Sequence, residues 1–212
     1  MIHAKLATIT GIMYHQWGQF HKSMLRQMEC LEICEKELDP NDGYLAGMYN
    51  NLGNVAESMG DLEAAITWHE KSWKIRSTID DVTGENMAHS KANIARSFLM
   101  LGRDEEAIKN LDDAEATFQS CDAWFHESQW ALDHEYPYLH LLAMSFLICS
   151  IHYVKANLYL KNGDYKSAKV RYQKALYLLV KKAKAPQHTR TATCLYKLGV
   201  AAIDEKDYAP AM

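Results

Sequence analysis

The chain has 212 residues, of which 48% are hydrophobic, and carries a formal net charge of −4 with only four prolines and ten glycines. This composition is sufficient for a hydrophobic core and argues against an extended disordered chain. The negative charge gives no general electrostatic reason to bind nucleic acid or an anionic membrane surface. There is no long apolar stretch and no signal-peptide pattern, so we expect no membrane association. Five scattered cysteines without a CxxC pair are typical of reduced intracellular thiols and predict a cytoplasmic or nuclear location.

Pairs of helical segments joined at a glycine follow one another from the start of the chain. The first pair is expected at residues 3–17 and 20–37, and a turn-forming segment at residues 38–43 ends it. In the second pair, Gly60 is expected to end one helix in the left-handed conformation, and Asp61 is expected to cap the next. The third pair is expected over residues 84–118. These segments predict an all-α protein.

The second half of the chain is less regular. Residues 119–137 interrupt the pattern, and a long apolar helix with a partner helix follows over residues 138–184. Pro186 then breaks the chain before another pair begins. The last pair is incomplete and neither end has a polar capping repeat, so we expect a piece of a longer array whose uncovered ends favour self-association. We predict a single superhelical domain over residues 1–212, with repeats at residues 1–40, 44–79, 84–118, 138–184 and 187–212 and an irregular insertion at residues 119–137.

The turn glycines define a repeat register. A shift of 42 residues takes Gly60 back to Gly18 and forward to Gly102, a further 61 residues lead to Gly163, and another 43 lead to a fifth turn position at Lys206. Small residues recur at three fixed offsets, as two antiparallel helices require where their axes cross closely. The residues seven positions before the turns are Gly11, Gly53, Ala95, Ala156 and Gly199. Those five positions after the turns are Ser23, Ala65, Ala107, Ala168 and Ala211. Those twelve positions after the turns are Cys30, Ser72, Ala114 and Ala175.

The run YNNLG at residues 49–53, followed by Gly60 and Ala65, resembles the signature of the tetratricopeptide repeat. The 42-residue period is similar to the long-helix variant found in kinesin light chains and in regulator-type arrays. The resemblance implies a right-handed α-solenoid of about five helical hairpins. Departures from the signature occur at Thr10, Lys155 and Lys206.

A second resemblance concerns the carboxyl-terminal part. The run TCLYKLG at residues 193–199, after PQH at residues 186–188, is similar to the carboxyl-terminal arrays of fungal receptor-like proteins that carry an NB-ARC or NACHT ATPase. It implies the ligand-sensing region of a nucleotide-binding receptor-like protein. Two alternatives stay open: a stand-alone adaptor or cargo scaffold, and a regulatory domain that binds a small molecule or a signal peptide.

No residue pattern indicates catalysis. The histidines of residues 126–140 lack the spacing of a metal site. Cys30 and Cys34 lie one helical turn apart, and we interpret them as core thiols because Cys30 occupies a small-residue position. There is no phosphate-binding glycine loop. We therefore expect no enzyme activity, no metal and no cofactor.

The resemblance implies that the first helices of successive repeats line a concave groove for a protein or peptide ligand. Asn54 and Asn157 occupy the same repeat position, where an amide can exchange hydrogen bonds with the backbone of an extended peptide. A cluster of cations that would clamp a carboxyl terminus is not indicated, since Arg96 has only Lys161 as a less direct companion. By the family's register the groove residues are Asn50, Asn54, Glu57, Arg96, Tyr153, Asn157 and Tyr196.

The segment at residues 119–137 contains Trp124 and Trp130, and large aromatic residues often anchor interfaces. Two interpretations stay open for these side chains. They pack onto the following long helix, or they form a wall of the groove beside Arg96 and Asn157 and contact the ligand.

Overall fold

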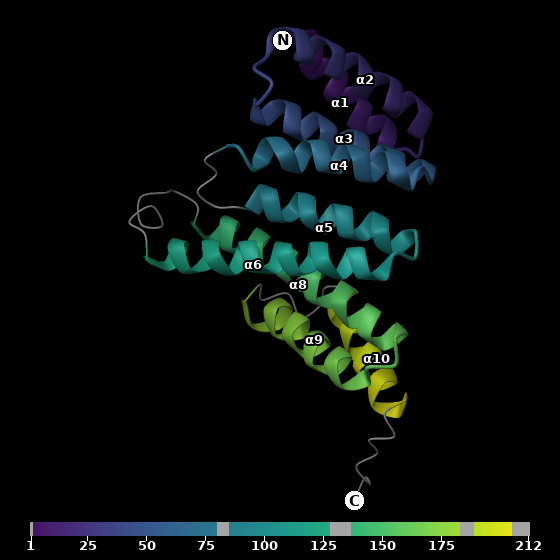
Figure 1. Cartoon of the computed structure of the whole chain (residues 1–212), viewed down its shortest axis with the longest axis vertical. Helices are drawn as coiled ribbons and strands as arrows, with labels where there is room; N and C mark the ends of the chain where they lie inside the picture. The colour runs from purple at the N-terminus through teal and green to yellow at the C-terminus, as the bar shows by residue number, and fades with distance from the viewer. Residues whose placement is uncertain (1, 80–84, 128–136, 183–188, 205–212) are drawn as a thin grey trace, which may run out of the picture. The chain divides into compact units, whose positions relative to one another are not determined.

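The computed structural model describes residues 2–79, 85–127, 137–182 and 189–204, and these residues form helices and connections with no strand among them (Figure 1). The all-α prediction is confirmed. Internal contacts divide the chain into two compact units, Met1–Thr117 and Phe118–Met212. The sequence pattern instead suggested one continuous superhelix, which stays a prediction, and the two units are described separately below.

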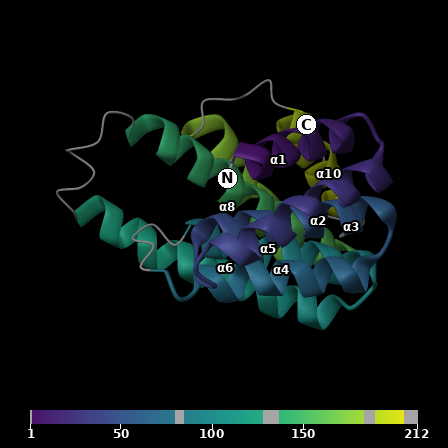
Figure 2. The same cartoon turned by 90° about the horizontal axis from the view of Figure 1, so that it is seen from above.

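Unit 1 consists of successive helical hairpins. Its helices are α1 (Ile2–Gln16), α2 (Phe20–Glu37), α3 (Gly43–Met59), α4 (Leu62–Arg76), α5 (Glu85–Met100) and the part of α6 (Asp104–Glu127) up to Thr117. The hairpin α3–α4 packs against α2 on one side and α5 on the other. Figure 1 shows α3 and α4 running alongside each other, and Figure 2 shows the same helices from above, where they overlap. The α6 helix extends nine residues past Phe118 into the segment assigned to the irregular insertion, because no glycine or proline interrupts residues 119–127.

The predicted turn glycines all adopt the left-handed conformation. Gly18, Gly60, Gly102 and Gly163 have φ values between 71° and 84°. At Gly60 the backbone N–H donates to the Glu57 carbonyl at 3.0 Å, which closes the end of α3. Asp61 then caps α4, since its Oδ1 accepts a hydrogen bond from the Ala64 N–H at 3.2 Å. The glycine-turn register is therefore confirmed.

The small residues of the repeat register lie where neighbouring helices approach each other. At each of the three offsets in the first four repeats these residues are buried, whereas Gly199 is exposed and Ala211 lies outside the described residues. Two of them also bond across the interface: Ser23 Oγ donates to the Gly11 carbonyl and Ser72 Oγ to the Ala46 carbonyl, both at 2.8 Å. Close approach and hydrogen bonding thus occur at the same positions.

A fourth repeat position is also buried, and it is occupied by large residues. Nine residues after the four turn glycines stand Gln27, His69, Leu111 and Tyr172, none of them more than 1% exposed. In the first two repeats the side chain packs onto a glycine of the preceding helix. A Cβ on Gly11 would lie 2.8 Å from Gln27 Nε2, and one on Gly53 would lie 2.5 Å from His69 Cε1. A side chain in place of Gly53 would therefore have to displace the His69 ring, whereas one in place of Gly11 would have to displace the flexible end of Gln27.

The two neighbouring cysteines of α2 belong to the core of unit 1. Cys30 and Cys34 are fully buried, with their sulfur atoms 3.8 Å apart. Burial is the main factor that raises the pKa of the Cys34 thiol, to about 12. A buried, protonated thiol is a poor nucleophile, in agreement with the interpretation of these cysteines as core residues.

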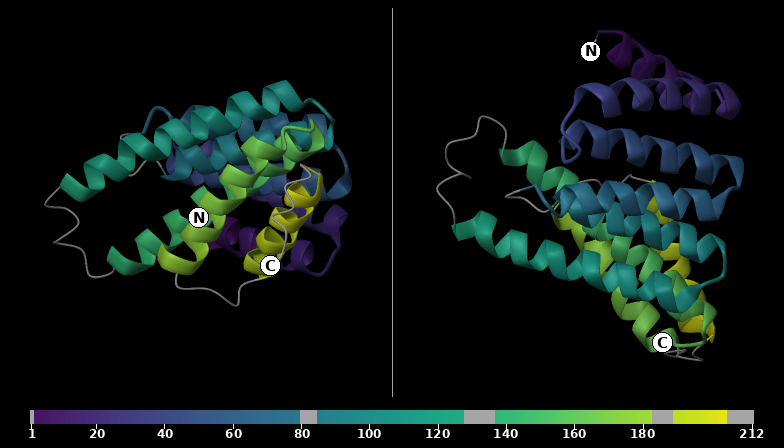
Figure 3. Two further views of the ribbon diagram at one scale, coloured as in Figure 1. Left: turned by 90° about the horizontal axis from the view of Figure 1, so that it is seen from below. Right: turned by 45° about the horizontal axis from the view of Figure 1, so that its top comes forward.

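Unit 2 contains the long apolar helix α8 (Pro137–Lys161), its partner α9 (Tyr165–Tyr177), a short π-helical turn η1 (Leu178–Lys182) and α10 (Thr189–Asp204). Figure 3 shows α10 lying against α9. The core of this unit centres on the fully buried Tyr172, with Ala156 of α8 and Cys194 of α10 in the same cluster. The expected long helix and its partner are thus both present.

Candidate functional site

A cavity of about 380 Å³ opens between the first helices of the repeats in unit 1. Its walls come from α1, α3 and α5, and one residue of α2, Gln27, also borders it. Two of the lining side chains, Ile12 and Val55, are apolar, and the others are polar or charged. The lining residues are Ile12, His15, Gln16, Gln27, Asn51, Asn54, Val55, Glu57, Ser58 and Arg96.

Three of the predicted groove residues come together at one side of this cavity. Arg96 Nε donates to Glu57 Oε1 at 2.7 Å, and Arg96 Nη2 donates to Asn54 Oδ1 at 3.2 Å. Glu57 Oε2 also accepts a hydrogen bond from Ser97 Oγ at 3.1 Å. Asn54 and Arg96 are 42 residues apart, so they occupy the same position in successive repeats. The only cation among the lining residues is therefore paired with the only carboxylate.

Carboxamide side chains dominate the remaining polar lining of the cavity. Within the described residues, the side chains of Gln16, Gln27 and Asn51 make no hydrogen bond, and Asn54 uses only its oxygen. Each carboxamide can donate and accept hydrogen bonds. The cavity thus presents several unused donors and acceptors without an excess of charge.

Asn50 does not line this cavity, although the sequence register placed it in the groove. It is only 9% exposed, and its Oδ1 accepts a hydrogen bond from Nδ2 of Asn93 at 2.9 Å. The rotation of α3 turns position 50 toward α5 rather than toward the cavity. The prediction that Asn50 faces the groove is therefore corrected: it joins α3 to α5.

The predicted groove residues of unit 2 make contacts of their own. Asn157 Oδ1 accepts a hydrogen bond from the Tyr172 hydroxyl at 2.7 Å, and the Tyr153 ring lies edge-on to Tyr172 with centroids 5.9 Å apart. Burial raises the pKa of Tyr172, so this hydroxyl keeps its proton and acts as the donor. Tyr196 on α10 is 69% exposed. Their role in ligand binding stays a prediction.

The two tryptophans proposed as interface anchors lie beyond the side chains that the structure describes. Trp124 is part of helix α6, but only its backbone is described, and Trp130 falls in the undescribed segment 128–136. Neither interpretation of these residues is tested. The side chains of the histidines considered as metal ligands, at residues 126–140, also lie outside those that the structure describes. The described residues contain no cluster of three metal-binding side chains.

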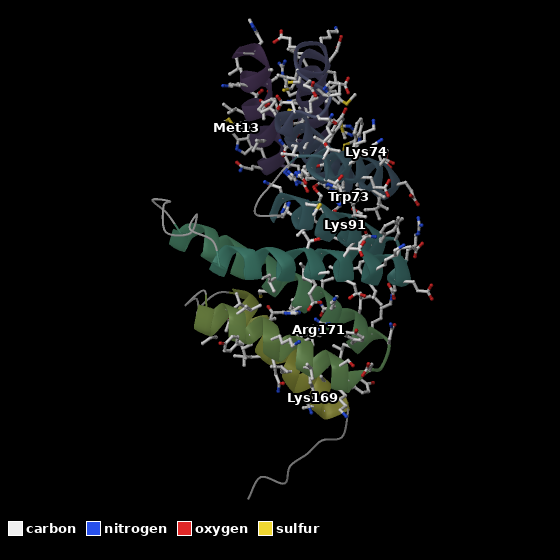
Figure 4. The ribbon with its side chains drawn as sticks, turned by 60° about the vertical axis from the view of Figure 1, so that its left-hand side comes forward. Met13, Trp73, Lys74, Lys91, Lys169 and Arg171 are labelled. Carbon is white, nitrogen blue, oxygen red and sulfur yellow. The ribbon has the colours of Figure 1, made fainter. Side chains whose placement is uncertain are left out.

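A second cavity of about 470 Å³ is lined mainly by α4, with Lys91 and Ile94 of α5 and Asn110 of α6. Lys91 Nζ lies 4.3 Å from the centre of the Trp73 ring, and the two side chains are adjacent in Figure 4. The same ammonium donates to Asp113 Oδ2 at 3.1 Å and to Asn110 Oδ1 at 3.3 Å. These contacts neutralise the charge of Lys91, but Lys71 and Lys74 also line the cavity and Glu70 is its only carboxylate, so it has an excess of positive charge that the first cavity lacks.

His69 is buried near the cavity but does not line it. Neither ring nitrogen has a hydrogen-bond partner among the described residues. Burial, followed by the charge of Arg96 and then His89 and Arg76, lowers the pKa of His69 to about 3. The imidazole is therefore neutral in the folded protein at physiological pH. Burial also lowers the pKa of His89.

Family models of the tetratricopeptide repeat match residues 44–120 and 150–178 of the chain. Together with the glycine-turn register and the stacked hairpins, these matches show that the chain contains tetratricopeptide repeats. A search of curated proteins with the sequence found no match. Among the described residues, no helix is both long and apolar enough to cross a membrane.

Solved structures with the same fold include kinesin-light-chain-like arrays. The nearly identical TPR-like repeats of a P. anserina kinesin light chain superpose with a TM-score of 0.69 at 15% identity, covering 98% of this chain and 89% of that one. BtubC of P. vanneervenii superposes with a TM-score of 0.63 at 20% identity, over 98% and 83% of the two chains. The apo quorum sensor NprR of B. thuringiensis superposes with a TM-score of 0.67 at 14% identity, and the match covers 96% of this chain and 49% of that one. At these identities the likeness concerns the fold alone.

Proposed function

We propose that the chain is a protein-interaction module whose unit 1 cavity binds an extended, uncharged stretch of polypeptide. The observation that carries this proposal is the set of carboxamides lining the cavity formed by α1, α3 and α5. A peptide backbone offers one donor and one acceptor per residue, which is what unused carboxamides pair with. Asn54 Nδ2, which has no partner within the described residues, is the foremost of these groups.

The electrostatics of the cavity favour a neutral segment over a charged terminus. Arg96 is already bonded to Glu57 at 2.7 Å, so an anionic ligand would have to compete with that carboxylate. A cationic ligand would compete with Arg96 in the same way. The interior of a polypeptide chain requires neither exchange.

The biological setting belongs to the same proposal. The resemblance of residues 186–199 to fungal receptor-like proteins favours a cytoplasmic ligand-sensing region of a nucleotide-binding receptor-like protein. A stand-alone adaptor or scaffold, or a regulatory domain for a small molecule or signal peptide, is the alternative. A phosphate-binding loop encoded upstream in the full-length gene product supports the receptor and contradicts the stand-alone adaptor.

Selection of binders from a random peptide library displayed on phage, followed by calorimetry with the full chain, tests the proposed binding. We expect selected peptides to be neutral in their central part and to lose about tenfold in affinity on Asn54→Ala. The matched control is Asn162→Ala, which removes an exposed amide in the turn after α8. Failure to recover any binding peptide, or equal binding to both variants, would overturn the assignment of the cavity.

A further inference from the structure

Gln27 differs from the other carboxamides of the cavity because it is buried. It is 1% exposed, and its Oε1 is buried yet accepts no hydrogen bond from the described residues. Its Nε2 packs against Gly11, at the place where a Cβ would lie 2.8 Å away. Neither end of this amide is bonded to any residue that the structure describes. A buried polar group without a partner costs stability, so its presence beside a cavity requires an explanation.

The place of Gln27 in the repeat shows that the fold does not require an amide there. Equivalent positions in later repeats hold His69, Leu111 and Tyr172, all equally buried. Leucine therefore satisfies the packing requirement of this position without leaving polar atoms unpaired. Of these four side chains, Gln27 alone lines the cavity between α1 and α3.

On the basis of the proposed peptide-binding function, we propose that Gln27 forms the floor of a subsite that accepts a primary carboxamide, the side chain of a glutamine or asparagine in the bound peptide. A carboxamide can both donate and accept a hydrogen bond, so it can pair with whichever end of the Gln27 amide meets the cavity. Rotation about the terminal torsion of Gln27 presents either end of its amide to the ligand. The pairing would satisfy the group that the unbound protein leaves unpaired.

The lining of the subsite agrees with a neutral polar occupant. Ile12 and Val55 flank the cavity with apolar surface that suits the methylene groups of a glutamine, and Gln16 and Asn51 offer further amides. A carboxylate of the same shape cannot donate to Gln27 and would be desolvated without a free cation, because Arg96 is bonded to Glu57. The subsite should therefore distinguish glutamine from glutamate.

The test uses the full chain and pentapeptides of four alanines around one central residue. An acetyl group and an N-methylamide cap their ends, so the central side chain supplies the only primary carboxamide. The central residue is glutamine, glutamate or methionine, the last matching glutamine in length without its amide. Binding is followed by calorimetry and by the side-chain amide resonance of Gln27 in protein labelled with ¹⁵N-glutamine, which is assigned from its loss in Gln27→Met.

The glutamine peptide should bind roughly fivefold to tenfold more tightly than the other two and should shift the Gln27 resonance. Gln27→Leu and Gln27→Met should abolish this preference while the melting temperature stays the same or rises. His69→Leu, which changes the equivalent buried residue away from the cavity, should keep the preference. Equal binding of the three peptides would overturn the carboxamide subsite but not the proposed peptide-binding function. If none of the three peptides binds and phage selection recovers no peptide, both proposals are overturned. A preference that survives Gln27→Met would place the amide contact elsewhere and also refute the inference.

Discussion

The imidazole ring of His69 in α4 packs directly on the α-carbon of Gly53 in α3, so closely that an added Cβ would lie within 2.7 Å of three ring atoms. His69 is completely buried, and neither ring nitrogen has a partner in the part of the chain that the structure describes. A glycine that is costly in a helix is thus required by a side chain on the neighbouring helix. In the third repeat the same two positions hold Ala95 and Leu111.

Gly53→Ala should destabilise unit 1 because the new methyl group meets the His69 ring. We expect a loss of about 1–3 kcal/mol, as for overpacking of a core, despite the better helix propensity of alanine. The double variant Gly53→Ala/His69→Leu copies the third repeat and should recover most of that loss. Urea denaturation of the two single variants and the double variant measures the coupling, and simple additivity would contradict direct packing of the two residues.

Acidification should weaken unit 1 through His69. Its pKa is about 3 in the folded state, against an ordinary value near 6.5, so the unfolded chain binds one more proton between these values. The free energy of unfolding should therefore fall with falling pH, starting near pH 6.5, by up to about 1.4 kcal/mol per pH unit from this residue. His89, whose pKa is also lowered by burial, acts in the same direction.

Denaturation curves of the wild type and His69→Leu, recorded between about pH 7 and pH 5, measure the contribution of this residue. The variant should show a shallower loss of stability on acidification. Parallel pH profiles for the two proteins would show that His69 titrates alike in the folded and unfolded states.

Gly60→Val should destabilise the hairpin α3–α4, because Gly60 has φ 84° and a β-branched residue is strained there. We expect a cost of about 1 kcal/mol or more. Gly47 supplies the matched control: it lies inside α3 with open space around its Cβ position, so Gly47→Ala should stabilise by about 0.5–1 kcal/mol. Thermal denaturation measures the melting temperature of both variants, and an unchanged melting temperature for Gly60→Val would be inconsistent with a strained cap.

Tyr172→Phe should destabilise unit 2 by about 1–2 kcal/mol, since it removes the hydroxyl that donates to Asn157 Oδ1 at 2.7 Å. The ring itself remains, so packing with Tyr153 is kept. Tyr177→Phe is a suitable control because that residue is 56% exposed on the same helix. Equal denaturation midpoints for both variants would mean that the Asn157 bond contributes nothing to stability.

The apolar face of α1 should support self-association. Leu6 and Ile9 lie on this helix and Trp17 follows its last residue, and each of the three is between 57% and 61% exposed; Met13 of α1 is 41% exposed. Contiguous apolar surface of this kind tends to recruit another molecule. Sedimentation velocity should show association that rises with concentration and is reduced by Ile9→Glu/Trp17→Glu. A monomer at every concentration would contradict this expectation.

The repeat architecture was readable from the sequence because it depends on residue size and backbone freedom. Gly18, Gly60, Gly102 and Gly163 stand at fixed distances from small residues, and both properties appear directly in the sequence. The approach of Arg96 to Asn54 follows from the same register, since equivalent positions of adjacent repeats are neighbours in a stack. Physical constraints repeated along the chain are the ones that a single sequence shows.

The contacts that the sequence did not predict depend on helix rotation and on individual pairs. Asn50 and Asn93 are 43 residues apart, one more than the repeat, so register alone does not pair them. The buried position of Gln27 and His69 was also hidden, because its four occupants share neither polarity nor shape. Only the packing onto Gly11 and Gly53 shows what these residues have in common.

The Asn50–Asn93 hydrogen bond has a consequence for how unit 1 can move. Sliding α5 along α3 by even one residue, about 1.5 Å, would separate two buried amides that have little access to water. The bond thus resists sliding of the third hairpin along the second, and it fixes the distance from Arg96 to Asn54. Ligands would then meet a binding surface of constant width, so differences in affinity should appear chiefly as differences in residence time.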